Sequence, residues 1–175
     1  MNCRLTGITQ PEPLDSDVQL IEGSQVGLLV EPDCSFGYYN NLIIRGFVDT
    51  GMELRADENI LHEVHIYRFP AFQYRTALRL RGRHSYVAQC SFDNFTRTGV
   101  EILSDNVKIE TCYFKRWSAA FGTGAVTPGD AIRLGDRNTK VRNVFISGNS
   151  IYSEMPEEEK YQEALLTAVN NVQAA

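Results

Sequence analysis

Short alternations of apolar and polar residues recur along the chain at a regular interval. Residues 51–54, 77–80, 99–102 and 131–134 each read small, apolar, charged, apolar. Alternation with a period of two predicts a β-strand with one buried face. The sequence therefore predicts one such strand in every repeat of a periodic structure.

A second set of segments keeps the same register and ends on a large apolar residue. These terminal residues are Phe47, Phe69, Phe92, Phe114 and Ile151. The first four recur every 22 residues or so, which is typical of solenoids, and the step to Ile151 is longer by about 15 residues. Two short strands per period without a helical pattern describe one coil of a parallel β-helix, whose coils bury their apolar faces by stacking. We predict an all-β, single-stranded parallel β-helix of about five coils over residues 26–153.

Stacking predicts columns of equivalent residues one strand spacing apart, roughly 4.8 Å. The inward column reads Met52, Leu78, Val100 and Ile132, and the outward column reads Glu53, Arg79, Glu101 and Arg133. The outward charges alternate in sign, and opposite charges in facing positions stabilise strand pairs. This alternation played no part in finding the repeat, so it supports the alignment independently.

The strand endings at residues 89–92, 111–114 and 146–151 resemble those of right-handed parallel β-helices of the pectate-lyase-like superfamily, which includes bacteriophage tailspikes. The resemblance implies a right-handed fold. It does not imply one activity, because the superfamily contains lyases, hydrolases, epimerases and non-catalytic virion parts. By analogy with tailspikes it also implies a homotrimer.

Three further segments depart from the repeat. Residues 1–25 are polar and turn-rich, and we interpret them as an arm that either caps the first coil or attaches to a neighbour. Residues 118–130 form an inserted loop. Residues 154–175 carry an acidic first turn and an apolar stripe at helical spacing, which predicts an amphipathic helix serving as cap or oligomerisation element.

Composition narrows the class of partners. The chain has 175 residues, 43% hydrophobic and 22% charged, with a net charge of −5, which is typical of one soluble domain and argues against nucleic acid or an anionic membrane as partner. No run of about 18 apolar residues predicts a membrane span, and the N-terminus does not read as a signal peptide. We expect synthesis in the cytoplasm, and the resemblance adds association with a virion.

Cysteines and histidines indicate no metal or redox site. Cys90 and Cys112 occupy one column, with Asn149 at the same position in the last coil, so we expect free, buried thiols. The three histidines do not converge on one another, and no Cys-x-x-Cys motif occurs. No cofactor is expected, except calcium if the protein is a lyase.

The first candidate catalytic pair is Glu53 with Glu101. They lie two coils apart, about 9.5 Å, which is the upper limit for the two acids of an inverting glycosidase. Arg79, however, is predicted to lie between them. An adjacent cation lowers a carboxyl pKa, whereas a general acid needs its pKa raised.

The second candidate site is a corner set suited to a lyase, with a cation as base and acidic groups holding calcium. Its members are Asp49, Asp93, Asn94, Lys115 and Arg116. The register places Asp93 beside Lys115 and Asn94 beside Arg116, so ordinary ion pairing accounts for them equally well.

Binding residues are expected at the inserted loop, because solenoid insertions often carry the binding face. The candidates are Lys115, Arg116, Trp117 and Phe121, with a subunit-contact loop as the equal alternative. The turn at residues 32–40 is rich in aromatic residues. Its tyrosines are suited to stacking on sugar rings, but packing against a neighbouring coil is the favoured interpretation.

Two functions from different classes follow. The first is a non-catalytic structural or adhesion module that resembles a phage tailspike or fibre β-helix, with polysaccharide as the ligand to test. The alternative is a polysaccharide lyase or glycoside hydrolase of the same fold. The small number of coils and the absence of a convincing catalytic set in the sequence favour the first.

Overall fold

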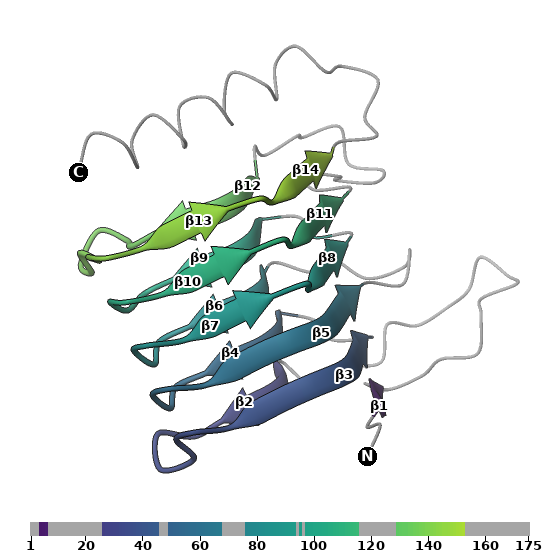
Figure 1. Ribbon diagram of the computed structural model, residues 1–175, viewed down its shortest axis with the longest axis horizontal. Coiled ribbons are helices and arrows are strands. Elements are labelled where there is room, and N and C mark those ends of the chain that lie inside the picture. Colours follow the sequence, from purple (N-terminus) through teal and green to yellow (C-terminus); the bar gives the residue numbers. More distant parts are fainter. Residues whose placement is uncertain are drawn as a thin grey trace, which may run out of the picture.

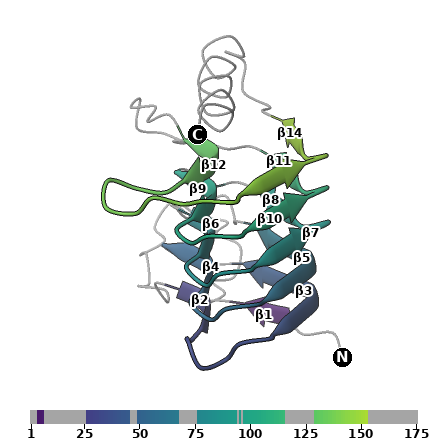
Figure 2. The same cartoon turned by 60° about the vertical axis from the view of Figure 1, so that its left-hand side comes forward.

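The chain forms a parallel β-solenoid, seen in a computed structural model that describes residues 4–6, 26–45, 49–67, 76–93, 95, 97–115 and 129–152. Every described strand pair is parallel, and the described residues contain no helix. Two sheets run side by side along the solenoid, with the chain passing from one to the other in each turn (Figures 1 and 2). The prediction of an all-β parallel solenoid is confirmed.

The first sheet has five strands in the order β12-β9-β6-β4-β2. They are β2 (Val26–Val30), β4 (Thr50–Leu54), β6 (Thr76–Leu80), β9 (Thr98–Ile102) and β12 (Asp130–Leu134). The last four are the segments that apolar–polar alternation predicted, and their register is also as predicted: Met52, Leu78, Val100 and Ile132 are successive partners.

The second sheet has nine strands. They are β1 (Arg4–Thr6), β3 (Tyr38–Arg45), β5 (Ile60–Tyr67), β7 (Tyr86–Ala88), β8 (Ser91–Asp93), β10 (Lys108–Glu110), β11 (Tyr113–Lys115), β13 (Phe145–Ser147) and β14 (Ser150–Tyr152). The long β5 pairs with both β7 and β8, so a single strand in one turn becomes two short strands in the next. β1 pairs with β3 and lies along its edge.

Three successive turns have neighbours on both sides in both sheets: β4–β5, β6–β8 and β9–β11. The described strands therefore build a solenoid of about three turns, flanked by β2 and β3 at one end and by β12, β13 and β14 at the other. The predicted arm over residues 1–25, apart from β1, and the predicted helix over residues 154–175 lie outside the described residues.

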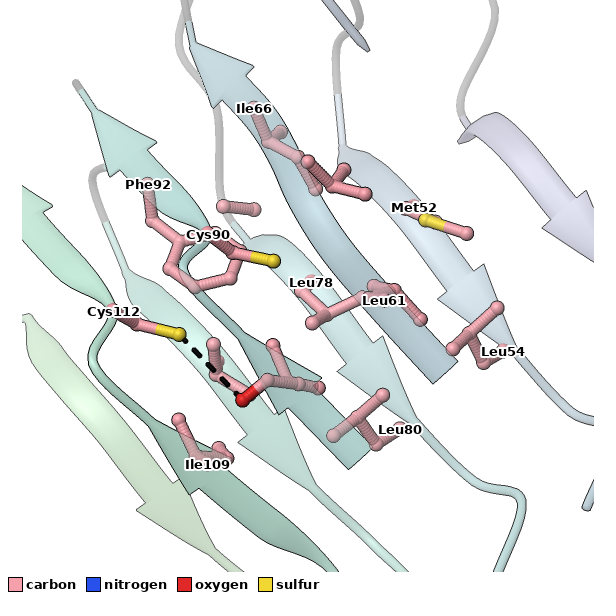
Figure 3. Packing of buried hydrophobic residues seen from close by; sticks show 14 of the residues in the cluster. Met52, Leu54, Leu61, Ile66, Leu78, Leu80, Cys90, Phe92, Ile109 and Cys112 are labelled. Atoms are coloured by element: carbon pink, nitrogen blue, oxygen red, sulfur yellow. Dashed lines mark hydrogen bonds between the residues drawn. The ribbon is translucent and has the colours of Figure 1, made fainter. Parts of the chain in front are cut away.

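The core lies between the two sheets and consists of stacked columns (Figure 3). Phe92 and Phe114 occupy one column, are fully buried and have ring centroids 5.1 Å apart. Leu61, Val87 and Ile109 form a second column of fully buried partners. Stacked aromatic and branched side chains provide the apolar area that each turn cannot bury alone.

The predicted column of terminal aromatics is wrong in the first two turns. Phe92 pairs with Ile66, and Ile66 pairs with Ile44, so isoleucines occupy the column in these turns; Phe47 and Phe69 themselves lie outside the described residues. Aromatic and β-branched side chains are interchangeable at an inward position, which is why the search for aromatics chose the wrong residues. The turn from β4 to β6 is also longer, with 26 residues between the partners Glu53 and Arg79 against 22 between Arg79 and Glu101.

Two columns of left-handed backbone bends shape every turn. The first column contains Phe36, Glu58, His84, Asn106 and Asn143, and the second contains Asn41, Glu63, Gln89, Thr111 and Gly148. In the first column the N–H of Phe36, Glu58 and His84 donates to a carbonyl of the following turn, at 2.8–3.3 Å. The bends thus change the direction of the chain while each turn keeps its hydrogen bonds to the next.

Candidate functional site

The outward charges of the five-stranded sheet form a continuous ladder of ion pairs. Arg79 lies between Glu53 and Glu101, with Nη1 3.3 Å from Glu53 Oε2 and Nε 2.7 Å from Glu101 Oε2. Arg133 continues the column, 4.0 Å from Glu101 and paired with Asp130. The strand register creates this ladder, because Glu53, Arg79, Glu101 and Arg133 are successive Cα partners.

Glu53 is the centre of the ladder and is almost completely enclosed. Its Oε1 accepts hydrogen bonds from Arg55 Nε at 2.8 Å and from Arg81 Nε at 3.1 Å, and its side chain is 4% exposed. Burial raises the pKa of Glu53, but the hydrogen bond from Arg55 and the charges of Arg55, Arg79 and Arg81 outweigh it, so the pKa lies below its usual value. The column faces outward as predicted, yet the arginine side chains cover its carboxylate.

This arrangement opposes acid catalysis by Glu53. A general acid must hold a proton near neutral pH, whereas the surrounding arginines favour the ionised form. Arg79 also binds Glu101, so each carboxylate of the predicted pair already has a cationic partner. The geometry is that of a structural ion-pair network linking adjacent turns.

The predicted lyase corner is only partly described. Lys115 and Asp93 are Cα partners on β11 and β8, as the register predicted, and Lys115 Nζ lies 4.8 Å from the ring centroid of Tyr113. Asp49 belongs to the charge ladder instead, since it lies 3.8 Å from Arg79 and accepts a hydrogen bond from Thr50. Asn94, together with the predicted binding residues Arg116, Trp117 and Phe121, lies outside the described residues, so this site stays a prediction.

The two stacked cysteines are buried thiols, as expected. Cys90 and Cys112 are each 1% exposed and free, and each Sγ donates to a nearby backbone carbonyl, as drawn for Cys112 in Figure 3. The hydrogen bond with Cys112 and burial raise the pKa of Cys90, which keeps it protonated. Asn149 occupies the equivalent position in the last coil. Its Oδ1 accepts a hydrogen bond from the N–H of Cys112, and its Nδ2 donates one to the carbonyl of Ile109. Reactivity at Cys90 is therefore disfavoured.

The feature that sequence reasoning missed is a shallow groove of about 530 Å³ at the bends leading into β3, β5 and β7. These bends lie along the left-hand side of Figure 1. The groove is lined by Phe36, Gly37, Tyr38, Glu58, Ile60, His84 and Tyr86. Phe36 is 75% exposed and Tyr38 is 62% exposed. The expectation that the tyrosines of this turn pack against a coil is therefore wrong for Tyr38, whereas Tyr39 packs against the core.

Two ladders form the walls of this groove. Tyr38, Ile60 and Tyr86 are successive partners at the start of their strands, and Phe36, Glu58 and His84 occupy the first column of left-handed bends. The buried Asn59 holds the base of the turn: its Oδ1 accepts from Gly37 N at 2.9 Å and its Nδ2 donates to Ala56 O at 2.7 Å. A Cβ at Gly37 would lie 2.5 Å from Asn59 Oδ1, so only glycine fits there.

Other kinds of site find little support in the described part of the chain. No group of three or more His, Cys, Asp or Glu side chains there is arranged to hold a metal ion. Among the same residues no helix is long and apolar enough to cross a membrane.

The fold and these surfaces define the class: a parallel β-solenoid with an ion-paired ladder on one sheet and an aromatic groove at its bends. Comparison with protein-family models, with curated proteins and with solved structures finds no match to this chain.

Proposed function

We propose that this protein is a non-catalytic structural or adhesion module that binds glycan on the outside of its solenoid. In its finer form the proposal is a right-handed parallel β-helix of about five coils, of the kind found in phage tailspikes and fibres, which self-associates as a trimer on a virion. The observation that carries the non-catalytic part is Arg79, which neutralises both Glu53 and Glu101.

The adhesive part is supported by the exposed aromatic side chains. A solenoid holds equivalent side chains at a fixed spacing on a rigid surface, which preorganises a binding face and lowers the entropic cost of binding. Exposed tyrosine and phenylalanine rings provide apolar contact area, and the tyrosine hydroxyl adds a hydrogen bond. Phe36 and Tyr38 are both more than half exposed on the outside of the solenoid.

The test uses the full chain with a panel of neutral and acidic bacterial polysaccharides, measuring both binding and polymer length. We expect binding without shortening, and light scattering is expected to give the mass of a trimer. The variants Asp93→Ala and Glu101→Ala serve as controls. Shortening that either variant abolishes would show a lyase or hydrolase and overturn the non-catalytic proposal, and failure to bind any member of the panel would overturn the adhesive one.

A further inference from the structure

We infer that the groove at the bends leading into β3, β5 and β7 is the binding site, and that its ligand is a short neutral glycan of one or two sugar rings. This inference rests on the proposed function and specifies it. The residues that carry it are Phe36, Tyr38, Glu58, Ile60, His84 and Tyr86.

The bends that line the groove have a left-handed backbone at residues with large side chains. Phe36, Glu58 and His84 have φ angles of 65°, 58° and 57°, in the left-handed region, where Asn, Asp and His are enriched but Phe and Glu are uncommon. The next two turns carry Asn106 and Asn143 at the same bend, the residue type that tolerates this conformation. In this column of bends, residues other than Asn therefore stand only in the three turns that line the groove. The second column carries such residues as well, at Glu63, Gln89 and Thr111, so the strain supports the groove only together with the exposure of Phe36.

The side chains that line the groove match the chemistry of a sugar ring. A sugar ring presents an apolar face of C–H groups and a rim of hydroxyls, which matches aromatic faces flanked by planar polar groups. Phe36 and Tyr38 supply exposed aromatic surface, while the Glu58 carboxylate accepts hydrogen bonds from hydroxyls and His84 donates or accepts them.

The charge of the groove lining favours a neutral ligand. Glu58 is the one carboxylate among the described residues that line the groove, and that lining contains no lysine or arginine. The net charge of the chain is −5. A uronic acid or another anionic sugar would meet repulsion from Glu58, and the cation at the end of the groove, Lys108, is already paired with Glu110 at 2.9 Å, whereas a neutral sugar would meet no such repulsion.

The extent of the groove along the solenoid axis limits the length of the ligand. In the turn after Tyr86 the partner residue is Lys108, whose Nζ lies 5.3 Å from the Tyr86 ring centroid and 5.5 Å from that of Phe145. Glu110 holds Lys108 in place at 2.9 Å. Lys108 thus follows Tyr86 in this column and is not among the residues that line the groove. The groove volume of about 530 Å³ lies within the range of small-ligand sites.

The experiment is calorimetric titration of the full chain with neutral di- and trisaccharides and with matched oligosaccharides that contain a uronic acid. We expect the neutral ligands to bind more tightly. Tyr38→Ala is expected to weaken that binding by about tenfold, whereas Tyr152→Ala, a matched exposed tyrosine outside the groove, is expected to leave it unchanged.

A second variant separates binding from folding. Phe36→Asn places the residue type of Asn106 and Asn143 at the strained bend, so we expect its melting temperature to rise by about 3 °C while binding weakens by about tenfold. If neutral glycans bind and both groove variants retain full affinity, or if acidic glycans are preferred, this inference is overturned and the proposed function stands. If the chain binds neither these oligosaccharides nor any polysaccharide of the panel, this inference and the adhesive part of the proposed function are both overturned.

Discussion

At the scale of single residues, three stacked threonines differ in their hydrogen bonding. Thr50, Thr76 and Thr98 are successive partners in the five-stranded sheet, and all three are fully buried. Thr50 Oγ1 donates to Asp49 Oδ2 at 2.9 Å, whereas the hydroxyls of Thr76 and Thr98 are buried without a hydrogen-bond partner. A buried hydroxyl without a partner destabilises the folded state, and a partnered one stabilises it.

Thr76→Val is therefore expected to raise the free energy of unfolding by about 1 kcal/mol, because valine has the same shape and removes the unpaired hydroxyl. Thr50→Val, the matched control, is expected to lower it by about 1 kcal/mol because it leaves Asp49 with one hydrogen bond fewer. Urea denaturation of both variants measures the difference. Equal losses in the two would show that Thr76 has a partner in solution.

Among the strands, the ion-pair ladder joins β4, β6, β9 and β12, which are neighbours in the five-stranded sheet. Its two glutamates are buried, with Glu53 3% and Glu101 6% exposed. Such a network specifies register, since slipping by one residue would place Arg79 opposite apolar side chains and leave Glu53 and Glu101 buried without it. The alternating signs of charge in the sequence are the pattern that this strand register requires.

Arg79→Met retains most of the aliphatic stem but removes the cation between two buried carboxylates. We expect it to lower the free energy of unfolding by about 3 kcal/mol, because breaking a buried pair leaves an uncompensated charge. Arg137→Ala, at an exposed arginine in the turn after β12, is expected to change it by no more than about 0.5 kcal/mol. A loss at Arg79 as small as the control would mean that the ladder contributes no stability.

At the scale of the whole molecule, stability depends on contacts between successive turns. The core columns run through both sheets along the axis, as Figure 3 shows for part of the cluster. Because each turn packs against its two neighbours, a defect in a central turn affects the interfaces on both sides.

Phe92→Ala tests this dependence. Phe92 is fully buried against Phe114, so we expect a loss of about 4 kcal/mol in the free energy of unfolding from the removed apolar contacts and the cavity left behind. Phe145→Ala, at a ring that is 53% exposed, is expected to cost less than about 1 kcal/mol. Thermal unfolding followed by circular dichroism measures both, and similar losses would contradict a core centred on Phe92.

The pattern of residues along the chain was enough to predict the solenoid, the strands β4, β6, β9 and β12 with their register, and the charge ladder. These features follow from period-two alternation and from the requirement that stacked positions be compatible, both of which are local and repeated. The register that makes Asp93 and Lys115 Cα partners was predictable for the same reason, and so was the position of Arg79 between two glutamates.

Two further features, the inward column of the first turns and the groove, depend on how the turns pack and became visible in the folded chain. The tertiary structure placed Ile44 and Ile66 in the column of Phe92, a choice that depends on the lengths of the bends rather than on residue type. It also brought Phe36, Glu58 and His84 together in one groove, although they are separated by whole turns of chain. Left-handed bends at such residues run against local preference, so no local pattern predicts them, and the packing of one turn on the next holds them in place.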